Sequence, residues 1–351
     1  MDAKGRGLGS SILVPSVQEL AKERLDKVPP RYIRLEDPLV VSSLPSSLPE
    51  VPIIDMEKLS SESELEKLHL ACKDWGFFQI INHGVSEILL EKVKEETQEF
   101  FKLSLEEKKK FWQKEDDVEG FGQAFVVSED QKLDWADMFF LTTLPHHMRK
   151  SHLFPNLPLP FRDTIEAYSE AVKDAAIKTL LYIAKALKME TKDMMELFDE
   201  GSMQSMRMNY YPPCPQPEQV MGLTPHSDAV GITFLLELND VAGLQIKKDD
   251  IWIPVKALPN AFILNIGEII EILTNGRYKS IEHRAIVNSE KERLSIATFL
   301  SPNLDGEIGP AASLITPETP PKFKRVTGID FFRNLFSREL NSKTNLEQYY
   351  I

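Results

Sequence analysis

The chain has 351 residues, of which 42% are hydrophobic and 27% are charged, and its formal net charge is −13. This length and composition can bury a large core, and the acidic balance argues against nucleic acid or an anionic membrane surface as the main partner. The two cysteines, Cys72 and Cys214, make no disulfide framework, and no apolar run reaches the roughly 18 residues that span a bilayer. We therefore expect a cytoplasmic protein that is a monomer.

The first part of the chain is predicted to be an arm followed by a helical domain. The arm would cover residues 1–47 and the helical domain residues 48–200. Apolar residues recur there at three- and four-residue spacing, which is typical of amphipathic helices. The predicted helices cover residues 17–27, 63–75, 87–101, 163–186 and 192–198. The charged run over 106–110 is interpreted as a solvated helix face.

The chain then changes to short β-rich segments separated by turn-forming Asp, Asn, Gly and Pro residues. Strands are predicted over 206–211, 229–236, 243–246, 252–255, 261–267, 280–287 and 293–299. Many short strands at this spacing favour a sandwich or a jelly roll. We place this jelly-roll domain at 201–303 and a helical extension at 304–351. The amphipathic helix expected over 330–346 would cover either the barrel mouth as a lid or the edge of the sheet.

Two histidines and a carboxylate in this region suit a metal site. His226 and Asp228 are two residues apart, so on a strand their side chains would share one face. His283 is the candidate for a third ligand. Two histidines and one carboxylate leave three coordination positions open, as in non-haem Fe(II) oxygenases. Each motif alone is more often made of ordinary strand residues than of metal ligands, and it is their order and context that favour a metal.

Arg293 and Ser295 would share a face of the last predicted strand. A guanidinium can bind a carboxylate through two hydrogen bonds, and a neighbouring hydroxyl adds another. The competing interpretation is a surface ion pair between Arg293 and a nearby glutamate. Asn209 and Tyr211 would share a face of the 206–211 strand and are candidates to donate hydrogen bonds to the same small acid.

Together these segments resemble the plant 2-oxoglutarate- and Fe(II)-dependent dioxygenase family. The resemblance extends over nearly the whole chain and includes residues 51–55 and 75–84, which in the family belong to the helical amino-terminal half. Within the family the chain is similar to the subgroup of thebaine 6-O-demethylase, codeine O-demethylase and the norcoclaurine-synthase-like dioxygenases. The segments that carry this likeness are 14–21, 119–123, 153–158 and 307–310.

The resemblance implies an α+β fold: a double-stranded β-helix, or jelly roll, with a helical amino-terminal half and a carboxy-terminal helix. It implies Fe(II), 2-oxoglutarate and O₂ as cofactors, with ascorbate as a reductant. The implied iron ligands are His226, Asp228 and His283. The implied 2-oxoglutarate-binding residues are Arg293, Ser295, Tyr211 and Asn209. The implied substrate-binding residues are Phe299, Met138, Phe140, Arg207, Phe121 and Phe125, for which ordinary core packing is the alternative in the apolar cases.

The function expected from this resemblance is oxidation of a C–H bond in a bulky aromatic or alkaloid-like compound of plant specialised metabolism. The reaction would be a hydroxylation or an O-demethylation, with release of succinate and CO₂. The alternatives are an oxygenase with the same site acting on a hormone or a flavonoid, an ascorbate-dependent iron enzyme, and a non-catalytic jelly-roll protein that binds a small molecule. A requirement for 2-oxoglutarate would separate the first two classes from the others.

Overall fold

The computed structural model describes residues 11–23, 25–34, 49–114, 117–198, 201–340 and 344–351. Its strands are β1 (Ile53–Asp55), β2 (Phe77–Ile81), β3 (Gly120–Gly122), β4 (Asp137–Leu144), β5 (Met203–Tyr211), β6 (Leu223–His226), β7 (Ile232–Glu237), β8 (Leu244–Lys248), β9 (Ile251–Pro254), β10 (Phe262–Ile266), β11 (His283–Ala285), β12 (Arg293–Ser301), β13 (Glu307–Ile308) and β14 (Val326–Thr327). The helices are α1 (Val17–Lys22), α2 (Glu62–Leu70), α3 (Glu87–Lys102), α4 (Leu105–Lys108), α5 (Leu159–Ala186), α6 (Thr191–Met195), α7 (Glu268–Leu273), α8 (Gly328–Phe336) and α9 (Thr344–Glu347).

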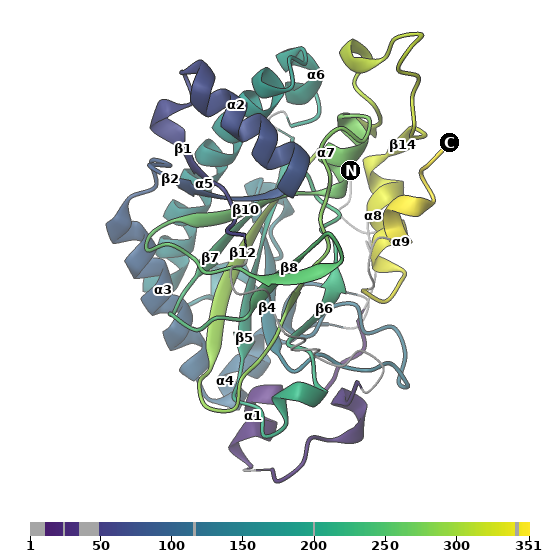
Figure 1. Ribbon diagram of the computed structural model, residues 1–351. Coiled ribbons are helices and arrows are strands. Elements are labelled where there is room, and N and C mark those ends of the chain that lie inside the picture. The colour runs from purple at the N-terminus through teal and green to yellow at the C-terminus, as the bar shows by residue number, and fades with distance from the viewer. Residues whose placement is uncertain (1–10, 24, 35–48, 115–116, 199–200, 341–343) are drawn as a thin grey trace.

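Two sheets form the centre of the molecule (Figure 1). The larger has eight strands in the order β1-β2-β10-β7-β12-β5-β4-β3, and the smaller has four in the order β6-β11-β8-β9. A two-stranded sheet joins β13 to β14 near the carboxy terminus. The α+β fold with a jelly-roll core is thereby confirmed.

The large sheet has one face for the core and one for the functional site. Side chains alternate between the two faces of a strand. In β12, Leu294, Ile296 and Leu300 are buried in the main core, whereas Arg293 and Ser295 take the opposite phase. The antiparallel register of β12 with β5 continues this division, because it pairs polar site positions with one another across the strands.

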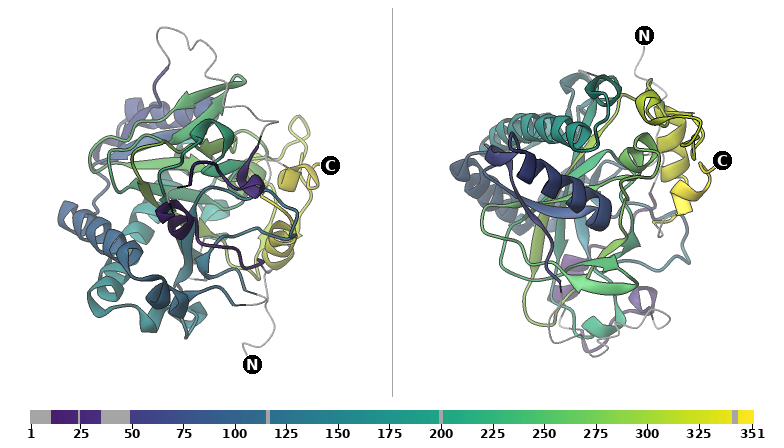
Figure 2. Two further views of the ribbon diagram at one scale, coloured as in Figure 1. Left: turned by 90° about the horizontal axis from the view of Figure 1, so that it is seen from below. Right: turned by 45° about the horizontal axis from the view of Figure 1, so that its top comes forward.

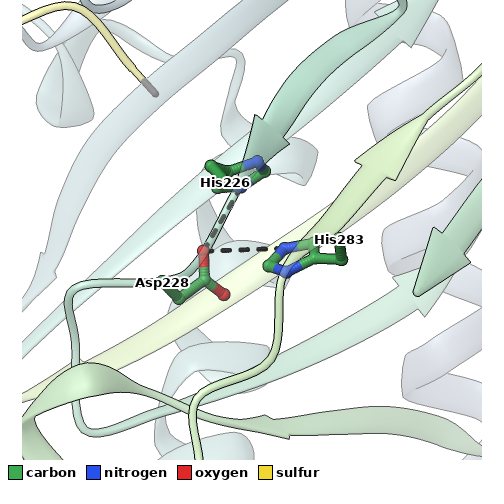
Figure 3. A group of neighbouring side chains, drawn as sticks. All are labelled: His226, Asp228 and His283. Atoms are coloured by element: carbon green, nitrogen blue, oxygen red, sulfur yellow. Dashed lines mark ion pairs between the residues drawn. The ribbon is translucent and has the colours of Figure 1, made fainter. Parts of the chain in front are cut away.

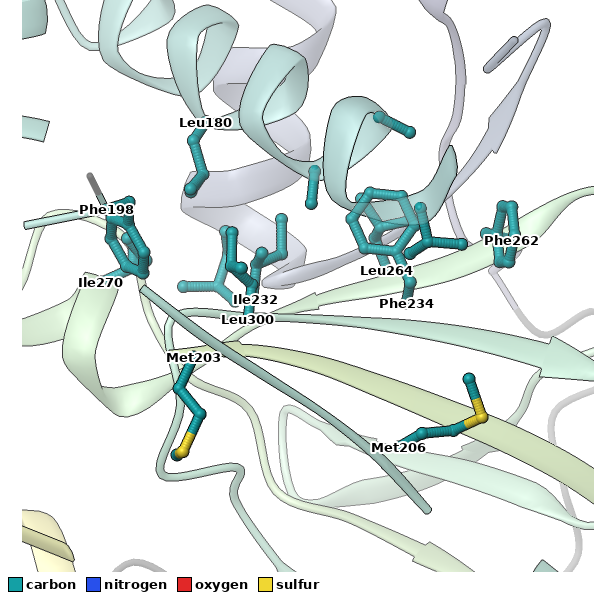
Figure 4. Close-up of a cluster of buried hydrophobic side chains, with 14 of the residues drawn as sticks. Leu180, Phe198, Met203, Met206, Ile232, Phe234, Phe262, Leu264, Ile270 and Leu300 are labelled. Atoms are coloured by element: carbon teal, nitrogen blue, oxygen red, sulfur yellow. The ribbon is translucent and has the colours of Figure 1, made fainter. Parts of the chain in front are cut away.

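Helices cover the core face of this sheet. The long helix α5 packs against α2, α3 and strands β4, β7 and β12, and the views in Figure 2 show these helices together on one side of the sheet. Leu180 of α5 points toward Ile232 and Leu300 of the sheet (Figure 4). Full burial of each such side chain contributes about 1.5–3 kcal/mol to stability. Among the described residues no helix has the length and apolarity needed to cross a bilayer.

The amino-terminal half contains more β-structure than the sequence indicated. Strands β1, β2, β3 and β4 all belong to the eight-stranded sheet, in which β2 pairs with β10 from the second half. Strands β2 and β4 also pair with β10 and β5, which lie far away in sequence, so local periodicity did not reveal their place in the sheet. The division of the chain at residue 200 remains a prediction, since one sheet continues across it.

Two further differences concern the second half. Helix α7 was not expected, and the strand predicted over 280–287 contains only the residues of β11. All three residues of β11 pair with β8, and His283 and Ala285 also pair with β6. In the amino-terminal arm, helix α1 is shorter than the helix predicted over 17–27.

The charged run over 106–110 is not solvated throughout. Lys108 is fully buried, whereas its neighbours are exposed. Its ammonium donates hydrogen bonds to Gln18 Oε1 and to the Phe101 carbonyl oxygen, the latter at 3.2 Å, and lies 5.3 Å from the centre of the Phe121 ring. Burial lowers the pKa of Lys108, although Asp137 and Glu19 oppose this effect. The predicted solvated face is therefore wrong at Lys108, because the amino-terminal arm covers this residue of α4.

The described part of the arm, from residue 11 to 34, is attached to the sheet through Asp137, while residues 1–10 and 35–48 lie outside the described residues. The Asp137 carboxyl is buried and accepts hydrogen bonds from Ser16 Oγ at 2.6 Å, Val17 N at 2.8 Å and Gln18 N at 2.9 Å. These contacts hold the first turn of α1 against the start of β4.

We expect Asp137→Ala to lower the free energy of unfolding by about 3 kcal/mol, because it leaves several buried donors without an acceptor. Denaturant unfolding measures this loss, and limited proteolysis near α1 would show whether the arm is released. Asp163→Ala is the control, because that side chain is 71% exposed and its loss should change stability by no more than about 0.5 kcal/mol. Equal stability of the two variants would contradict the attachment.

Candidate active site

Strand pairing brings the three predicted metal ligands together. His226 ends β6, Asp228 follows in the next loop, and His283 begins β11 directly opposite His226. Asp228 Oδ1 lies 3.5 Å from His226 Nε2 and 3.8 Å from His283 Nε2, and Figure 3 shows the three side chains pointing toward one another. One ligand atom from each side chain lies within 4.8 Å of the others. This cluster has the size and the donor types of a metal site.

Backbone carbonyls orient both imidazoles. His226 Nδ1 lies 2.8 Å from the Thr224 carbonyl oxygen, and His283 Nδ1 lies 3.2 Å from the Ile281 carbonyl oxygen. A carbonyl can only accept, so each Nδ1 carries a proton and each Nε2 is the ring nitrogen that faces Asp228. Burial lowers the pKa of His283 to about 4, with a further lowering by His226 that Asp228 opposes. At neutral pH His283 is therefore a neutral imidazole, as metal binding requires.

Two neighbouring side chains orient the carboxylate. Thr233 Oγ1 donates to Asp228 Oδ2 at 2.6 Å, and Asn265 Nδ2 donates to the same oxygen at 2.8 Å. Burial raises the pKa of Asp228, but His283, His226 and Thr233 together outweigh burial and leave it well below its ordinary value. Oδ1 therefore stays ionised and faces the two Nε2 atoms. Neither Thr233 nor Asn265 was found from the sequence, because neither lies in a recognisable motif.

Ser227, which lies between the candidate ligands His226 and Asp228, makes its side-chain hydrogen bond to a residue outside the ligand cluster. Ser227 Oγ donates to Glu268 Oε1 at 2.6 Å, and Asn345 Nδ2 donates to Glu268 Oε2 at 3.0 Å. The backbone N–H of Glu268 also donates to the Asp228 carbonyl oxygen at 2.8 Å. Through α7, the ligand loop is thus connected to the carboxy-terminal helix α9.

Arg293 is buried at the far end of the same strand face. Only 3% of it is exposed, and Nη2 pairs with Glu237 Oε1 of β7 at 2.5 Å. The surface ion pair that was the competing interpretation is therefore wrong, because β12 directs this side chain inward. Nε and Nη1 of Arg293 are buried without a hydrogen-bond partner in the described part of the chain. Two orphaned donors on a buried cation fit a carboxylate ligand.

The other predicted carboxylate-binding residues lie beside Arg293. Register pairs Arg293 with Tyr211 and Ser295 with Asn209. The Tyr211 ring centre is 5.0 Å from the guanidinium carbon of Arg293, and Asn209 Nδ2 lies 3.4 Å from Ser295 Oγ. Asn209 Oδ1 also has no hydrogen-bond partner within the described residues. Polar groups with spare hydrogen-bonding capacity thus gather at one end of the site.

A single cavity joins the His226–Asp228–His283 cluster to Arg293 and continues beyond both. It contains roughly 1310 Å³, including space open to solvent. Five of the six predicted substrate residues line it, namely Met138, Phe140, Arg207, Phe299 and Phe125. Helix α8 and the following residues close one side through Phe332, Leu335, Phe336 and Leu340, and Phe336 stacks on Phe125 with ring centres 5.3 Å apart. This supports the lid interpretation of the carboxy-terminal helix over the sheet-edge interpretation.

The prediction that Phe121 binds substrate is wrong. Its ring does not line this cavity but packs in the core, 6.5 Å from Phe100 and 6.2 Å from Phe101. The register places Phe121 opposite Phe139, which faces the core as well. The phase of this short strand decides the direction of the ring, and the sequence did not define that phase.

Several polar cavity residues were missed. Glu119, Thr142, Ser205 and Ser301 line the cavity together with the apolar side chains. For some of them, the alternation of side chains between the two faces of a strand could have predicted that they face the cavity. Ser205 lies two residues before Arg207, and Ser301 lies two residues after Phe299, so each continues a row that the sequence had begun.

Comparison with known proteins gives the same assignment for both halves of the chain. Residues 202–302 match the family model described as 2OG-Fe(II) oxygenase superfamily, and residues 51–158 match the one described as non-haem dioxygenase in morphine synthesis N-terminal. Oxoglutarate-dependent flavonoid 7-O-demethylase 1 of Ocimum basilicum is 56% identical over 98% of this chain and 93% of its own. Codeine O-demethylase of Papaver somniferum is 51% identical over 97% of each chain.

A solved structure is similar over the same extent. The crystal structure of JOX2 in complex with 2OG, Fe and JA has a TM-score of 0.88 and 36% sequence identity, and the match covers 98% of this chain and 99% of that chain. These findings confirm the resemblance inferred from the motifs, including its demethylase subgroup. They also confirm iron and 2-oxoglutarate as the cofactors, which the donor set and the orphaned Arg293 donors fit.

We expect Thr233→Val to weaken Fe(II) binding by about 10- to 100-fold, because Asp228 loses a hydrogen bond that orients its carboxylate. Anaerobic calorimetric titration of the apoprotein with Fe(II), or with Mn(II) as a stand-in, measures the change directly. Thr97→Val is the matched control, since that hydroxyl is buried on α3 without a hydrogen-bond partner among the described residues. Unchanged affinity in Thr233→Val would mean that Asp228 is oriented by Asn265 alone.

The double substitution Arg293→Met with Glu237→Gln should weaken 2-oxoglutarate binding by roughly 100-fold, as expected for the loss of charge-assisted hydrogen bonds. Replacing both partners avoids leaving the Glu237 carboxylate buried alone. Metal affinity should stay within about threefold of wild type, which titration with Mn(II) before 2-oxoglutarate would test. Glu237→Gln alone is the control. Loss of metal binding in the double variant would refute the assigned role of Arg293.

Proposed function

The chain belongs to the 2OG-Fe(II) oxygenase superfamily, and we propose that it oxidises a C–H bond of a bulky aromatic or alkaloid-like specialised metabolite. As a non-haem Fe(II) dioxygenase it uses 2-oxoglutarate and O₂. The finer assignment, to hydroxylation or O-demethylation of such a compound, rests on the cavity and on the character of its relatives.

We assign the iron to the Nε2 atoms of His226 and His283 and to Oδ1 of Asp228. Arg293 would donate Nε–H and Nη1–H to the distal carboxylate of 2-oxoglutarate, with Ser295 beside it. Tyr211 and Asn209 would complete the polar end. When bound, the iron would activate O₂, which supplies the oxidising equivalents: one oxygen atom would go to 2-oxoglutarate, which becomes succinate and CO₂, and the other to the C–H bond of the substrate. The protein's own contribution is to orient these groups and the substrate, and to exclude water.

The observation that carries this proposal is the composition of the cavity beyond the metal cluster. Phe140 and Met138 of β4 and Phe299 of β12 face it, and Phe125 and Phe336 stack on one another at its rim. Aromatic walls of this kind suit a flat or polycyclic molecule, because such a ligand can bury large apolar faces against them. A small polar substrate would leave most of this apolar cavity wall in contact with water.

We favour O-demethylation over plain hydroxylation. Both reactions begin with oxidation of a C–H bond, and a hydroxylated methoxy carbon then loses formaldehyde to leave a free hydroxyl. The two relatives with 56% and 51% identity are both named as O-demethylases. A methoxy group placed near the metal cluster would therefore be the reacting group in this chain.

A flavonoid is the second candidate for the substrate, because it too is a flat aromatic and one relative is named as a flavonoid demethylase. A hormone acid is a further candidate, because Arg207 lines the cavity with an Nε that has no hydrogen-bond partner among the described residues. The orphaned donors of Arg293 argue against a purely binding protein without a co-substrate, because they are costly unless an anion satisfies them.

We expect methoxylated flavones or methoxylated alkaloids to stimulate succinate release from 2-oxoglutarate in the Fe(II)-loaded protein. Formaldehyde should appear in a one-to-one ratio with succinate above the substrate-free background. Parallel assays without 2-oxoglutarate, and with ascorbate in its place, are the controls. Succinate without formaldehyde would indicate hydroxylation, and no stimulation by any bulky aromatic would contradict the proposed substrate class.

A further inference from the structure

Glu119 is a buried carboxyl group inside the substrate cavity. It directly precedes β3, is 6% exposed and lines the cavity together with Thr142 and Phe125. Its Oε2 accepts the backbone N–H of Thr142 at 2.7 Å. No lysine, arginine or histidine of the described residues lies within ion-pair distance of it. Burial raises the pKa of Glu119 to about 7, although the hydrogen bond from Thr142 opposes this rise.

Other buried carboxyl groups in this protein have strong partners. Asp137 accepts three hydrogen bonds from the arm, Glu237 pairs with Arg293, and Glu271 accepts from Lys279 Nζ at 3.0 Å and Ser280 N at 2.8 Å. Glu119 is an exception because Thr142 is the one hydrogen-bond partner of its carboxyl group among the described residues. A carboxyl buried with so little compensation is costly to the fold. A ligand that donates a hydrogen bond would remove this cost.

Glu119 lies across the large sheet from the metal cluster. Thr142 pairs with Ser205, and Ser205 pairs with Phe299 across the next strand. Tyr211, which pairs with Arg293, lies at the opposite end of the cavity-facing row of β5. The 2-oxoglutarate end and the Glu119 end are therefore separated along the strands. Thr233 of β7, which donates to Asp228, pairs with Phe299, so the metal cluster lies at the level of Thr142 and is separated from it by β12 and β5. A substrate whose reacting group approaches the metal cluster would extend its other end across these strands toward Glu119.

We propose that Glu119 accepts a hydrogen bond from a hydroxyl group of the substrate and so selects hydroxylated, uncharged aromatic compounds among those that the cavity admits. This inference rests on the proposed function, since it concerns the far end of the same substrate. Glu119 would be a specificity-determining residue, in contact with substrate but not with the reacting carbon.

The charges of the cavity favour a neutral hydroxyl over a cationic amine. Arg207 lines the same cavity, and its Nε is buried without a hydrogen-bond partner in the described chain. A protonated amine would be repelled by Arg207 and would need a fully ionised Glu119. A hydroxyl group can donate to a carboxyl in either protonation state, because an acceptor lone pair remains in both. An oxygen elsewhere on the same ligand could in turn accept from Arg207.

The test compares three probes on the protein loaded anaerobically with Mn(II) and 2-oxoglutarate. Two are methoxyflavones that differ only in one hydroxyl on the ring remote from the methoxy group, and the third is a methoxylated tertiary amine of similar size. Calorimetric titration gives a dissociation constant for each, independently of turnover. We expect wild type to bind the hydroxylated flavone about tenfold more tightly than its partner, as for one hydrogen bond to a buried acceptor.

Two substitutions at Glu119 then separate the explanations. Glu119→Leu should abolish the tenfold preference, whereas Glu119→Gln should retain most of it, because the glutamine carbonyl can still accept the hydroxyl hydrogen. Glu129→Gln is the matched control, since that side chain is 75% exposed on the surface and its replacement should change nothing. If the Glu119→Leu variant does not fold, the Glu119→Gln variant still tests the proposal through its binding of the three probes.

Equal binding of the two flavones by wild type, or a preference that survives in Glu119→Leu, would overturn the proposal. Tightest binding of the amine, lost in Glu119→Gln, would overturn it in favour of a cationic substrate. If wild type binds 2-oxoglutarate normally but none of the three probes, the proposed substrate class fails and this inference fails with it. Binding of both flavones without discrimination would refute the role of Glu119 alone.

Discussion

The pairing of β6 with β11 is the constraint on which the functional site depends. It places His226 directly across from His283, although the two residues lie far apart in the chain. Because the carbonyls of Thr224 and Ile281 accept from the two Nδ1 atoms, both Nε2 atoms face Asp228. A shift of one residue in this register would turn one imidazole to the other face of the sheet and separate the ligands.

The large sheet supplies the second requirement, which is a division between an apolar and a functional face. Leu294 and Ile296 contribute to the core beneath α5, while Arg293 and Ser295, in the opposite phase of the same strand, belong to the site. Rigid packing on one face thus holds the polar groups on the other. This arrangement allows a buried Arg293 to keep two donors without protein partners, since Glu237 compensates its charge.

Prediction succeeded where a motif carried its own chemistry and failed where the direction of a side chain depended on distant strands. The ligand triad and the Arg293–Ser295 pair were recognised because their residue types and spacing match a known donor set. Phe121 was misplaced because its pairing with Phe139 turns it to the core, and Glu119 was overlooked because it lies outside β3 and contacts the cavity residue Thr142 of β4. Lys108 was assigned to solvent because the arm that buries it lies far away in sequence.

The sequence by itself determined the family and the cofactors and nominated the residues that we propose hold them, since these depend on residue type, order and local spacing. Tertiary structure alone decided which carbonyls orient His226 and His283, which groups orient Asp228, and that Glu237 pairs with Arg293. It also decided that Glu119 faces the substrate cavity with Thr142 as its limited support. The physical reason is that these contacts join residues from different strands and loops, and strand register is a property of the whole sheet.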